Sequence, residues 1–151
     1  MRRSDRQLGE AEARDILERG AYGVLSTVSR DGVPYGVPLS YCVLEGAVYL
    51  HCAREGRKLD HLARDPRVSF CVVGVTRVLP EEFGTLYESC VVEGVAHEAI
   101  GAEKQAALEG LLAKYSPDHV DEGLRYIEEL RDETRVFRID VAALSGKARR
   151  V

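Results

Sequence analysis

Residues 22–43, which read YGVLSTVSRDGVPYGVPLSYCV, decide the fold of this chain. Two β-like runs, at residues 22–28 and 33–43, flank the turn SRDG at residues 29–32. The Asp-Gly pair in that turn favours the left-handed backbone that a tight hairpin needs. A third β-like run follows at residues 47–53 with no helix in between. Because parallel neighbours need a long crossover connection, the three runs predict an antiparallel meander and not a parallel nucleotide-binding sheet.

The rest of the chain alternates helix-like and strand-like segments. Apolar periodicity and end signals predict helices at residues 10–19, 57–64, 102–114 and 117–132. Further strands are predicted at residues 67–73, 75–79, 87–99 and 134–141, and Gly94 indicates a bulge or bend. Residues 80–86 are predicted to form a loop, and residues 145–151 a loosely held polar tail. Residues 1–151 therefore predict a single domain, mainly β with peripheral helices, folded as an antiparallel barrel or sandwich.

The composition is typical of a soluble globular domain. Of the 151 residues, 30% are charged and 45% belong to the apolar set, which is enough to build a core. The formal charge of −4 at pH 7 argues against general affinity for nucleic acids. No apolar run is long enough to span a membrane, and the charged N-terminus lacks the apolar run of a signal peptide. We therefore expect a cytoplasmic protein.

The cysteines do not form a C-x-x-C pair, and all of them fall in apolar, strand-like runs. They are Cys42, Cys52, Cys71 and Cys90. We predict that they are small buried residues in a reducing compartment, with a metal site or disulfides as the alternatives. No spacing between a cysteine and a histidine suggests a zinc site or a nucleophilic pair.

Three cations gather where the third β-like run gives way to a helix: Arg54, Arg57 and Lys58. A helix N-terminus already carries about half a positive charge, so this arrangement is unfavourable unless an anion lies among the cations. A phosphate group would satisfy the backbone N–H groups, the helix dipole and the cations together. The alternative is a solvated basic turn that pairs with Glu55 and Asp60. The local sequence leaves both interpretations open.

In the second and third β-like runs, alternate side chains are expected to point to opposite faces of the sheet. In the second run, the residues of one parity are large and predict a core face: Val33, Tyr35, Val37, Leu39, Tyr41 and Val43. The residues of the other parity are small, so that face could receive a flat ligand or pack closely against another layer. These residues are Pro34, Gly36, Pro38, Ser40 and Cys42.

His51 falls on the less apolar face of the third run, opposite Val48, Leu50 and Cys52. It leads directly into the basic turn. A structural role and a functional role both remain open for this histidine.

In the order of its strand-like runs and the turns between them, the chain resembles the pyridoxamine 5′-phosphate oxidase-related flavoproteins. Within them it most resembles the nitroimidazole-resistance (Nim) group. The matching segments are YGVLST at 22–27, GVPYGVPLSY at 32–41, YLHCA at 49–53, GRKL at 56–59, VSFCVVG at 68–74 and YESCVVEG at 87–94. The resemblance implies the FMN-binding split barrel, an antiparallel β-barrel, and an obligate homodimer with two FMN sites at the subunit interface.

The resemblance also implies roles for individual residues. It implies that Arg57 and Lys58 bind the FMN phosphate, and less directly that Arg54 does. His51 borders the flavin, is a feature of the Nim group, and is expected to position or protonate a substrate. The isoalloxazine ring would lie along Leu25, Ser26, Thr27, Pro38, Leu39 and Ser40, with Ser89 also reaching FMN.

The chain differs from pyridoxamine phosphate oxidases proper at its C-terminal end. Residues 134–151 do not clearly reproduce the basic and aromatic set that holds the substrate phosphate, although Lys147, Arg149 and Arg150 are basic. We therefore predict an FMN-dependent oxidoreductase that reduces nitroimidazole or other nitroaromatic compounds, and not a vitamin B6 oxidase.

Two alternatives share the barrel. One is a flavin- or haem-binding module without turnover, and the other is a deazaflavin-dependent reductase. The possible haem ligands are His51, His61, His97 and His119.

Overall fold

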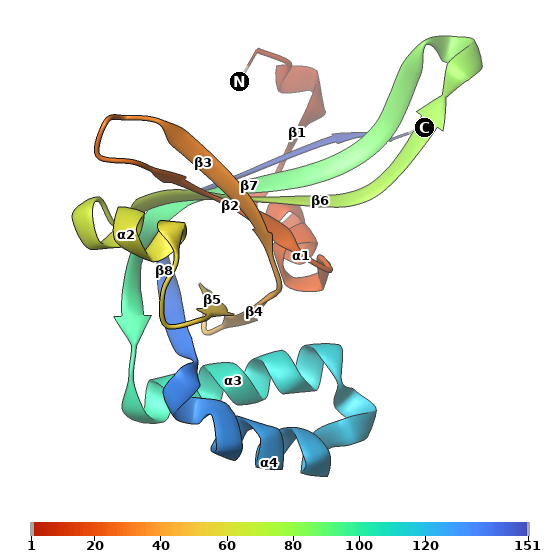
Figure 1. Ribbon diagram of the computed structural model, residues 1–151. Helices are drawn as coiled ribbons and strands as arrows, with labels where there is room; N and C mark the ends of the chain where they lie inside the picture. Colours follow the sequence, from red (N-terminus) through yellow and green to blue (C-terminus); the bar gives the residue numbers. More distant parts are fainter. Residues whose placement is uncertain (1, 151) are drawn as a thin grey trace.

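A computed structural model describes residues 2–150 as one antiparallel sheet with helices around it (Figure 1). The strand order is β3-β2-β6-β7-β8-β5-β4, and β1 pairs with β8. The strands are β1 (Gln7–Leu8), β2 (Gly23–Val28), β3 (Pro34–Leu39), β4 (Tyr41–Leu44), β5 (Ala47–Cys52), β6 (Arg67–Leu79), β7 (Gly84–Ala99) and β8 (Arg135–Arg149). The helices are α1 (Glu10–Arg19), α2 (Arg57–Arg64), α3 (Gly101–Tyr115) and α4 (Val120–Leu130).

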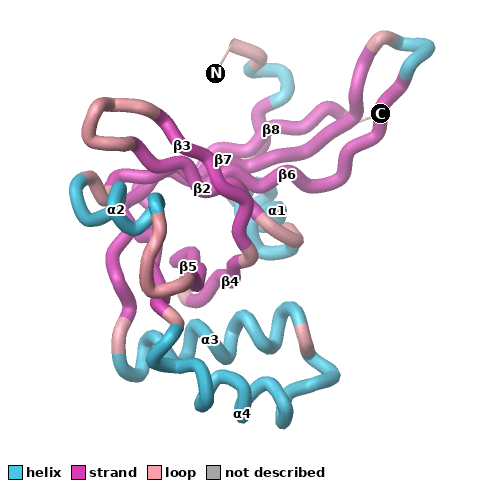
Figure 2. The backbone as a smooth tube through the Cα atoms, viewed as in Figure 1, coloured by secondary structure: helices cyan, strands magenta, loops and turns pink. Residues whose placement is uncertain are grey.

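The two edges of the sheet, β3 and β4, are consecutive in the chain and are joined by Ser40 alone. The sheet therefore curls until its ends meet at this corner, without a β3–β4 ladder (Figure 2). This is the predicted antiparallel split β-barrel. The predicted antiparallel pairing of the three runs is confirmed, because β3 pairs with β2 and β4 pairs with β5. The predicted continuous strand at residues 33–43 was wrong, because this run breaks at Ser40 into β3 and β4. Pro38 offers no N–H to a ladder, which suits β3 to an edge.

The change of direction at Ser40 also changes which residues are buried. The odd-numbered residues of β3 are half-buried, as predicted, but Val33 lies outside the strand and is 60% exposed. In β4 both Tyr41 and Cys42 are buried, because the barrel core covers one face and α3 covers the other. The predicted core face therefore holds on both sides of the corner, since Tyr41 and Val43 also pack on the barrel core. On the opposite face, Cys42 packs against α3, which is the close packing considered as the alternative.

The helices agree with the sequence predictions more closely than the strands do. The predicted helices at residues 10–19 and 57–64 coincide with α1 and α2, and α3 is one residue longer at each end than predicted. The predicted helix at residues 117–132 is α4 with a 3₁₀ turn on either side. Within residues 2–150, no helix is both long and apolar enough to cross a membrane. The cytoplasmic location stays a prediction.

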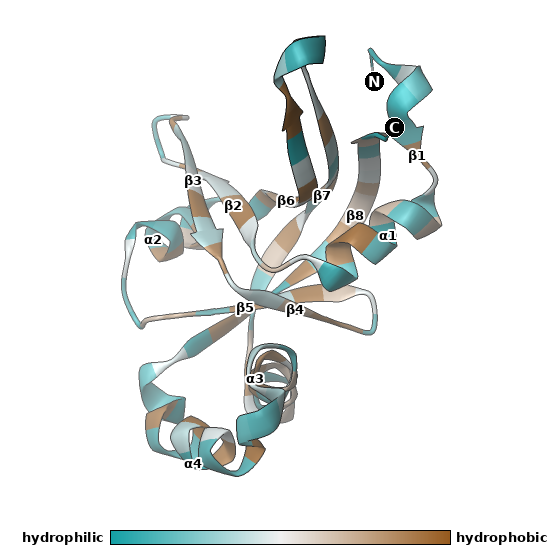
Figure 3. Ribbon diagram, turned by 90° about the vertical axis from the view of Figure 1, so that its right-hand side faces the viewer, coloured by the Kyte–Doolittle hydropathy of each residue, from teal (hydrophilic) through white to brown (hydrophobic). Residues whose placement is uncertain are grey.

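Strands β6 and β7 form a long hairpin whose far end projects from the barrel as an arm (Figure 3). Residues 80–86 are not the predicted loop, because only the 3₁₀ turn Pro80–Glu82 and Phe83 lie between the strands. The predicted bulge is confirmed, since the β7–β8 register shifts between Glu93 and Gly94. The arm exposes apolar side chains, and Phe83 is 97% exposed.

The predicted loose tail was wrong. Strand β8 continues to Arg149 and pairs with β7 over this stretch, while β1 pairs with Gly146 and Lys147. Gly146 and Ala148 are buried, and α1 packs so closely that a Cβ on Gly146 would lie 2.7 Å from the Ala13 Cβ. The partner strands and this helix order a segment whose own residues carry little strand signal. Val151 lies outside the described residues.

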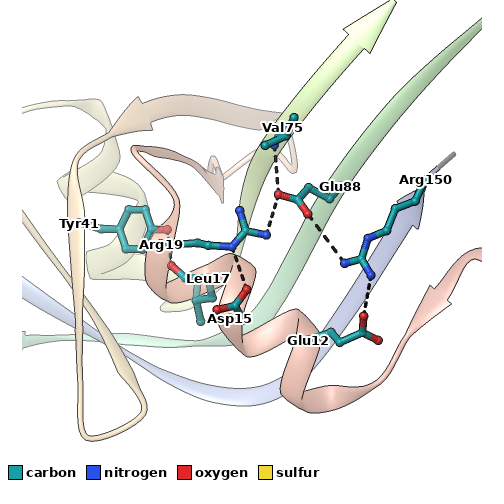
Figure 4. A network of polar contacts seen from close by, with 8 residues as sticks. All are labelled: Glu12, Asp15, Leu17, Arg19, Tyr41, Val75, Glu88 and Arg150. Atoms are coloured by element: carbon teal, nitrogen blue, oxygen red, sulfur yellow. Dashed lines mark hydrogen bonds and ion pairs between the residues drawn. The ribbon is translucent and has the colours of Figure 1, made fainter.

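Glu88 is a buried carboxylate that ties α1 to the sheet (Figure 4). Its Oε1 lies 2.7 Å from the Arg19 guanidinium and accepts a hydrogen bond from the backbone N–H of Val75 at 3.2 Å. Arg150 approaches its second oxygen at 3.9 Å, and Arg19 also pairs with Asp15 at 2.8 Å. The network therefore joins α1, β6, β7 and the residue that follows β8.

We expect Glu88→Gln to lower the free energy of unfolding at neutral pH by about 1.5–3 kcal/mol, the range for a hydrogen bond to a charged group. Burial by itself would raise the pKa of Glu88, but Arg19, the Val75 N–H and Arg150 lower it overall. The carboxylate therefore stabilises the fold fully above its ordinary pKa of 4.5, and this contribution is lost as the pH falls through the lowered folded-state pKa. Urea unfolding from neutral to acid pH measures the difference, which should shrink in acid.

Glu12→Gln is the matched control for this prediction. Glu12 pairs with Arg150 at 2.8 Å, but both side chains are largely exposed, so its loss should change stability far less. A Glu88→Gln deficit that stayed constant down to strong acid would contradict the assigned ionic role.

Candidate functional site

The predicted basic turn leads into the first turn of α2. The helix begins at Arg57 after Gly56, whose φ of +145° is rarely adopted by a residue with a side chain. The N–H groups of Leu59 and Asp60 donate to the Gly56 carbonyl at 2.9 and 3.2 Å. The N–H groups of Arg57 and Lys58 come before the first intrahelical bonds, so they are available to a ligand.

The three predicted cations have different surroundings. Arg54 forms an exposed ion pair with Glu133 at 3.4 Å. The Arg57 guanidinium lies 4.9 Å from the centre of the Tyr35 ring, and Lys58 is half-buried. Among residues 2–150, no carboxylate forms an ion pair with Arg57 or Lys58, including the two acidic neighbours considered above. Two of the three cations therefore remain available for an anionic group.

A buried histidine braces this turn against the barrel. His61 of α2 is hydrogen-bonded to Thr27 of β2, with 2.9 Å between Nδ1 and Oγ1. Its ring contacts the edge of Tyr35 of β3, with 5.8 Å between the ring centres, and Tyr35 in turn lies under Arg57. His61 was expected only as a possible haem ligand, and its contact with Thr27 and Tyr35 was not predicted. The signal was its spacing of four residues from Arg57, which puts both on one face of α2.

The predicted ring-binding residues of β2 divide between two faces. Leu25 and Thr27 point into the barrel core and are buried, so only their backbone could meet a ligand. Ser26 is half-buried on the outer face, where it is paired with Gly36 and Ser69 of the neighbouring strands.

On β3, Pro38 is exposed on that outer face and Leu39 is half-buried on the inner one. Ser40 is exposed at the corner and, together with His51 of β5, lines a cavity of about 620 Å³. The cavity lies between the barrel, α3 and α4.

His51 is exposed on β5, but its surroundings favour the neutral form of its ring. Desolvation by the surrounding protein lowers the pKa of His51, and the positive charge of Lys58 lowers it further. Near neutral pH the ring can therefore donate one hydrogen bond and accept another, but it is a poor proton donor in the acid–base sense.

Ser89 lies apart from the other predicted site residues. It is half-buried on the outer face of β7, paired with Val73 and Lys147. Gly23 is paired with Val72, so Ser89 lies beyond the start of β2, whereas α2 packs at the Thr27 end. With about 3.3 Å per residue along a strand, this separates Ser89 from the basic turn by on the order of 15 Å. One chain does not bring the two together.

The cysteines are free thiols, and three of them are buried as predicted. Burial raises the pKa of the Cys42 and Cys90 thiols to about 11, which makes them poor nucleophiles at neutral pH. Cys71 is half-buried on the outer face of β6. No cluster of three or more potential metal ligands occurs among the residues that the structure describes.

Comparison with known proteins identifies the class to which this barrel and site belong. The family model described as pyridoxamine 5′-phosphate oxidase matches residues 9–148. The chain therefore belongs to the pyridoxamine 5′-phosphate oxidase family, and the resemblance stated from the sequence is confirmed. A search of the curated proteins gives no match.

Solved structures support the same fold. A FAD and haem binding protein from Mycobacterium smegmatis has a TM-score of 0.83 at 19% identity, covering 97% of this chain and 74% of that one. A candidate 5-nitroimidazole antibiotic resistance protein from Bacteroides thetaiotaomicron has a TM-score of 0.76 at 20% identity, with 94% and 86% covered. A FAD-binding protein from Mesorhizobium loti has a TM-score of 0.68 at 25% identity, with 96% and 98% covered. These three likenesses show that the fold of the chain is shared with the three solved proteins.

Proposed function

We propose that this protein is an FMN-binding oxidoreductase that reduces nitroimidazole or other nitroaromatic compounds. One observation supports the binding of a flavin nucleotide. Arg57 and Lys58 lie at the N-terminus of α2 with no carboxylate partner in the described part of the chain. Cations, free N–H groups and the helix dipole together suit a phosphate monoester. Tyr35 and His61 keep Arg57 close to the barrel.

The other site residues are assigned by their position between the basic turn and the corner of the barrel at Ser40. Bound FMN would supply two-electron transfer chemistry. Ser40 and the backbone around Pro38 would contact its ring, and Ser26 faces the same outer surface. His51 would hold a substrate by hydrogen bonds, since its lowered pKa makes a charged imidazolium unfavourable. The similarity to a candidate nitroimidazole resistance protein supports the nitroaromatic class.

We also propose that the protein works as a homodimer with the cofactor at the subunit interface. Within residues 2–150, no helix covers the outer face of β2, β6 and β7, which carries the half-exposed side chains of Val24, Cys71 and Val91. A second subunit on this face would also bring its own Ser89 toward the basic turn, which the geometry of one chain does not achieve. Sedimentation equilibrium should give about twice 16.7 kDa, and a monomer at micromolar concentration would rule out the shared site.

The flavin proposal is tested by comparing FMN with riboflavin, which has the same ring but no phosphate. If the basic turn binds phosphate, FMN should bind on the order of 100-fold more tightly than riboflavin, because each charge-assisted hydrogen bond contributes about 1.5–3 kcal/mol. Flavin fluorescence quenching measures both affinities. Equal affinities would refute a phosphate site at α2, and no binding of either would refute the flavin assignment.

Haem is the second candidate, because two of the four histidines face the same cavity. His51 and His119 both line it, whereas His61 is engaged with Thr27 and His97 lies 3.4 Å from Asp140. A FAD and haem binding protein with this fold supports a non-catalytic binding module as the alternative. A Soret band on the purified protein would favour haem, and tighter binding of a deazaflavin than of FMN would favour the deazaflavin-dependent reductase.

A further inference from the structure

Helix α4 leaves its apolar side uncovered. None of its side chains is buried, although the helix is amphipathic. Tyr126 is 64% exposed, and Ile127 and Leu130 are only half-buried despite lying beside α3. Exposed apolar surface costs free energy in water, so an arrangement that retains it beside a cavity indicates an apolar occupant.

The uncovered side of α4 faces the cavity of about 620 Å³ that Ser40 and His51 also line. This volume lies in the range of small-molecule sites. A second cavity, of about 550 Å³, has five charged residues in its lining, among them Glu10, Arg14 and Asp140, and is not an apolar site of this kind. The apolar residues that line the α3–α4 cavity are Leu108, Leu111, Leu112, Tyr126, Ile127 and Leu130.

Polar side chains also line the α3–α4 cavity, and Glu122, the carboxylate among them, disfavours a negatively charged ligand. Ser40 and His51 lie at the barrel, and His119 and Glu122 lie at the start of α4. The desolvated ring of His51 favours its uncharged form. In the part of the chain that the structure describes, no arginine or lysine lines the cavity to bind a negatively charged group.

Tyr115 fixes the wall of the cavity to the barrel corner. Its hydroxyl accepts a hydrogen bond from the Tyr41 N–H at 3.0 Å and donates to the Ala21 carbonyl at 2.7 Å. The ammonium of Lys114 lies 3.7 Å from the centre of the Tyr41 ring, so the end of α3 is held twice. The cavity is therefore preformed on its α3 side, which lowers the cost of binding.

We infer that the α3–α4 cavity is the substrate pocket for a neutral, largely apolar molecule that carries an aromatic ring, with Ser40 and His51 at its reactive end. This inference rests on the proposed flavin site, because those two residues join the cavity to it. The dimer face proposed above lies on β2, β6 and β7, which contribute no residue to the lining of this cavity, so a second copy of the chain is a less suitable occupant.

A neutral fluorescent probe tests the inference. Prodan, a dimethylaminonaphthalene ketone, emits at shorter wavelength in apolar surroundings, and it would be titrated into the purified protein before and after saturation with FMN. We expect saturable binding that Ile127→Asn weakens roughly tenfold or more, the scale of a lost contact in an apolar pocket. Leu124→Asn is the matched control, because Leu124 lies on α4 away from the cavity and is 40% exposed.

The outcomes separate this inference from the flavin proposal. The pocket would be overturned if both variants and the wild type bound prodan with equal affinity. It would also be overturned if prodan did not bind at all, since another segment would then fill the cavity. FMN binding without prodan binding rejects the pocket alone, and prodan binding without FMN binding rejects the flavin proposal alone. If Ile127→Asn fails to fold by circular dichroism, Leu130→Asn replaces it with the same expectation.

Discussion

The double variant Arg57→Ala, Lys58→Ala should lose FMN affinity by about 3 kcal/mol or more, which is at least on the order of 100-fold. Both cations lie at the N-terminus of α2 without a carboxylate partner in residues 2–150, and the phosphate is the anion they are proposed to bind. Fluorescence titration with FMN and with riboflavin measures the loss. Riboflavin affinity should hardly change, because riboflavin has no phosphate for these side chains to hold.

Arg54→Ala is the control for this double variant. Arg54 already pairs with Glu133 on the surface, so its removal should weaken FMN binding much less. Unchanged FMN affinity in the double variant would place the phosphate elsewhere. An equal loss of FMN and riboflavin would instead point to damage to the ring site.

Gly94→Ala should destabilise the barrel strongly, lowering the free energy of unfolding by about 3 kcal/mol. A Cβ on Gly94 would lie 2.1 Å from the backbone oxygen of Asp140 and 2.9 Å from the Ile139 Cγ2. The obstacle is a backbone carbonyl of the paired strand β8, so relief requires the β7–β8 register to shift at the bulge. Urea unfolding followed by circular dichroism measures the loss.

Gly36→Ala tests whether adding a methyl group to a strand glycine is harmful in itself. A Cβ on Gly36 would meet only the side chains of Val24, at 3.3 Å, and Ser26, at 3.8 Å. We expect a change within about 0.5 kcal/mol. If both variants lost the same stability, the close approach of Gly94 to β8 could not be the cause.

Local signals in the sequence were sufficient to predict the helices near the site and the bulge in β7. Helix α2 follows from its apolar periodicity between Gly56 and Pro66, and Gly94 interrupts a run that otherwise reads as a strand. The cluster of cations at α2 was evident because it needs only three residues that are close in the chain.

Features that depend on distant partners could not be predicted. The break at Ser40 separates two edge strands, and which strands become edges depends on pairings made much later in the chain. The end of β8 is a strand because β7 and β1 flank it, not because of its own composition. Tyr35 of β3 contacts both Arg57 and His61 of α2. The spacing of Arg57 and His61 in the sequence places these two on one face of the helix, but nothing in the sequence indicates that Tyr35 joins them.

The absence of buried side chains on α4 has an evolutionary consequence. Substitutions at its exposed positions scarcely disturb the barrel interior, so they carry little penalty in fold stability. Descendants of this chain could alter the shape and polarity of the cavity by changing α4 alone, while Arg57 and Lys58 stay as they are. Diversification of ligand choice could thus proceed without a loss of foldability.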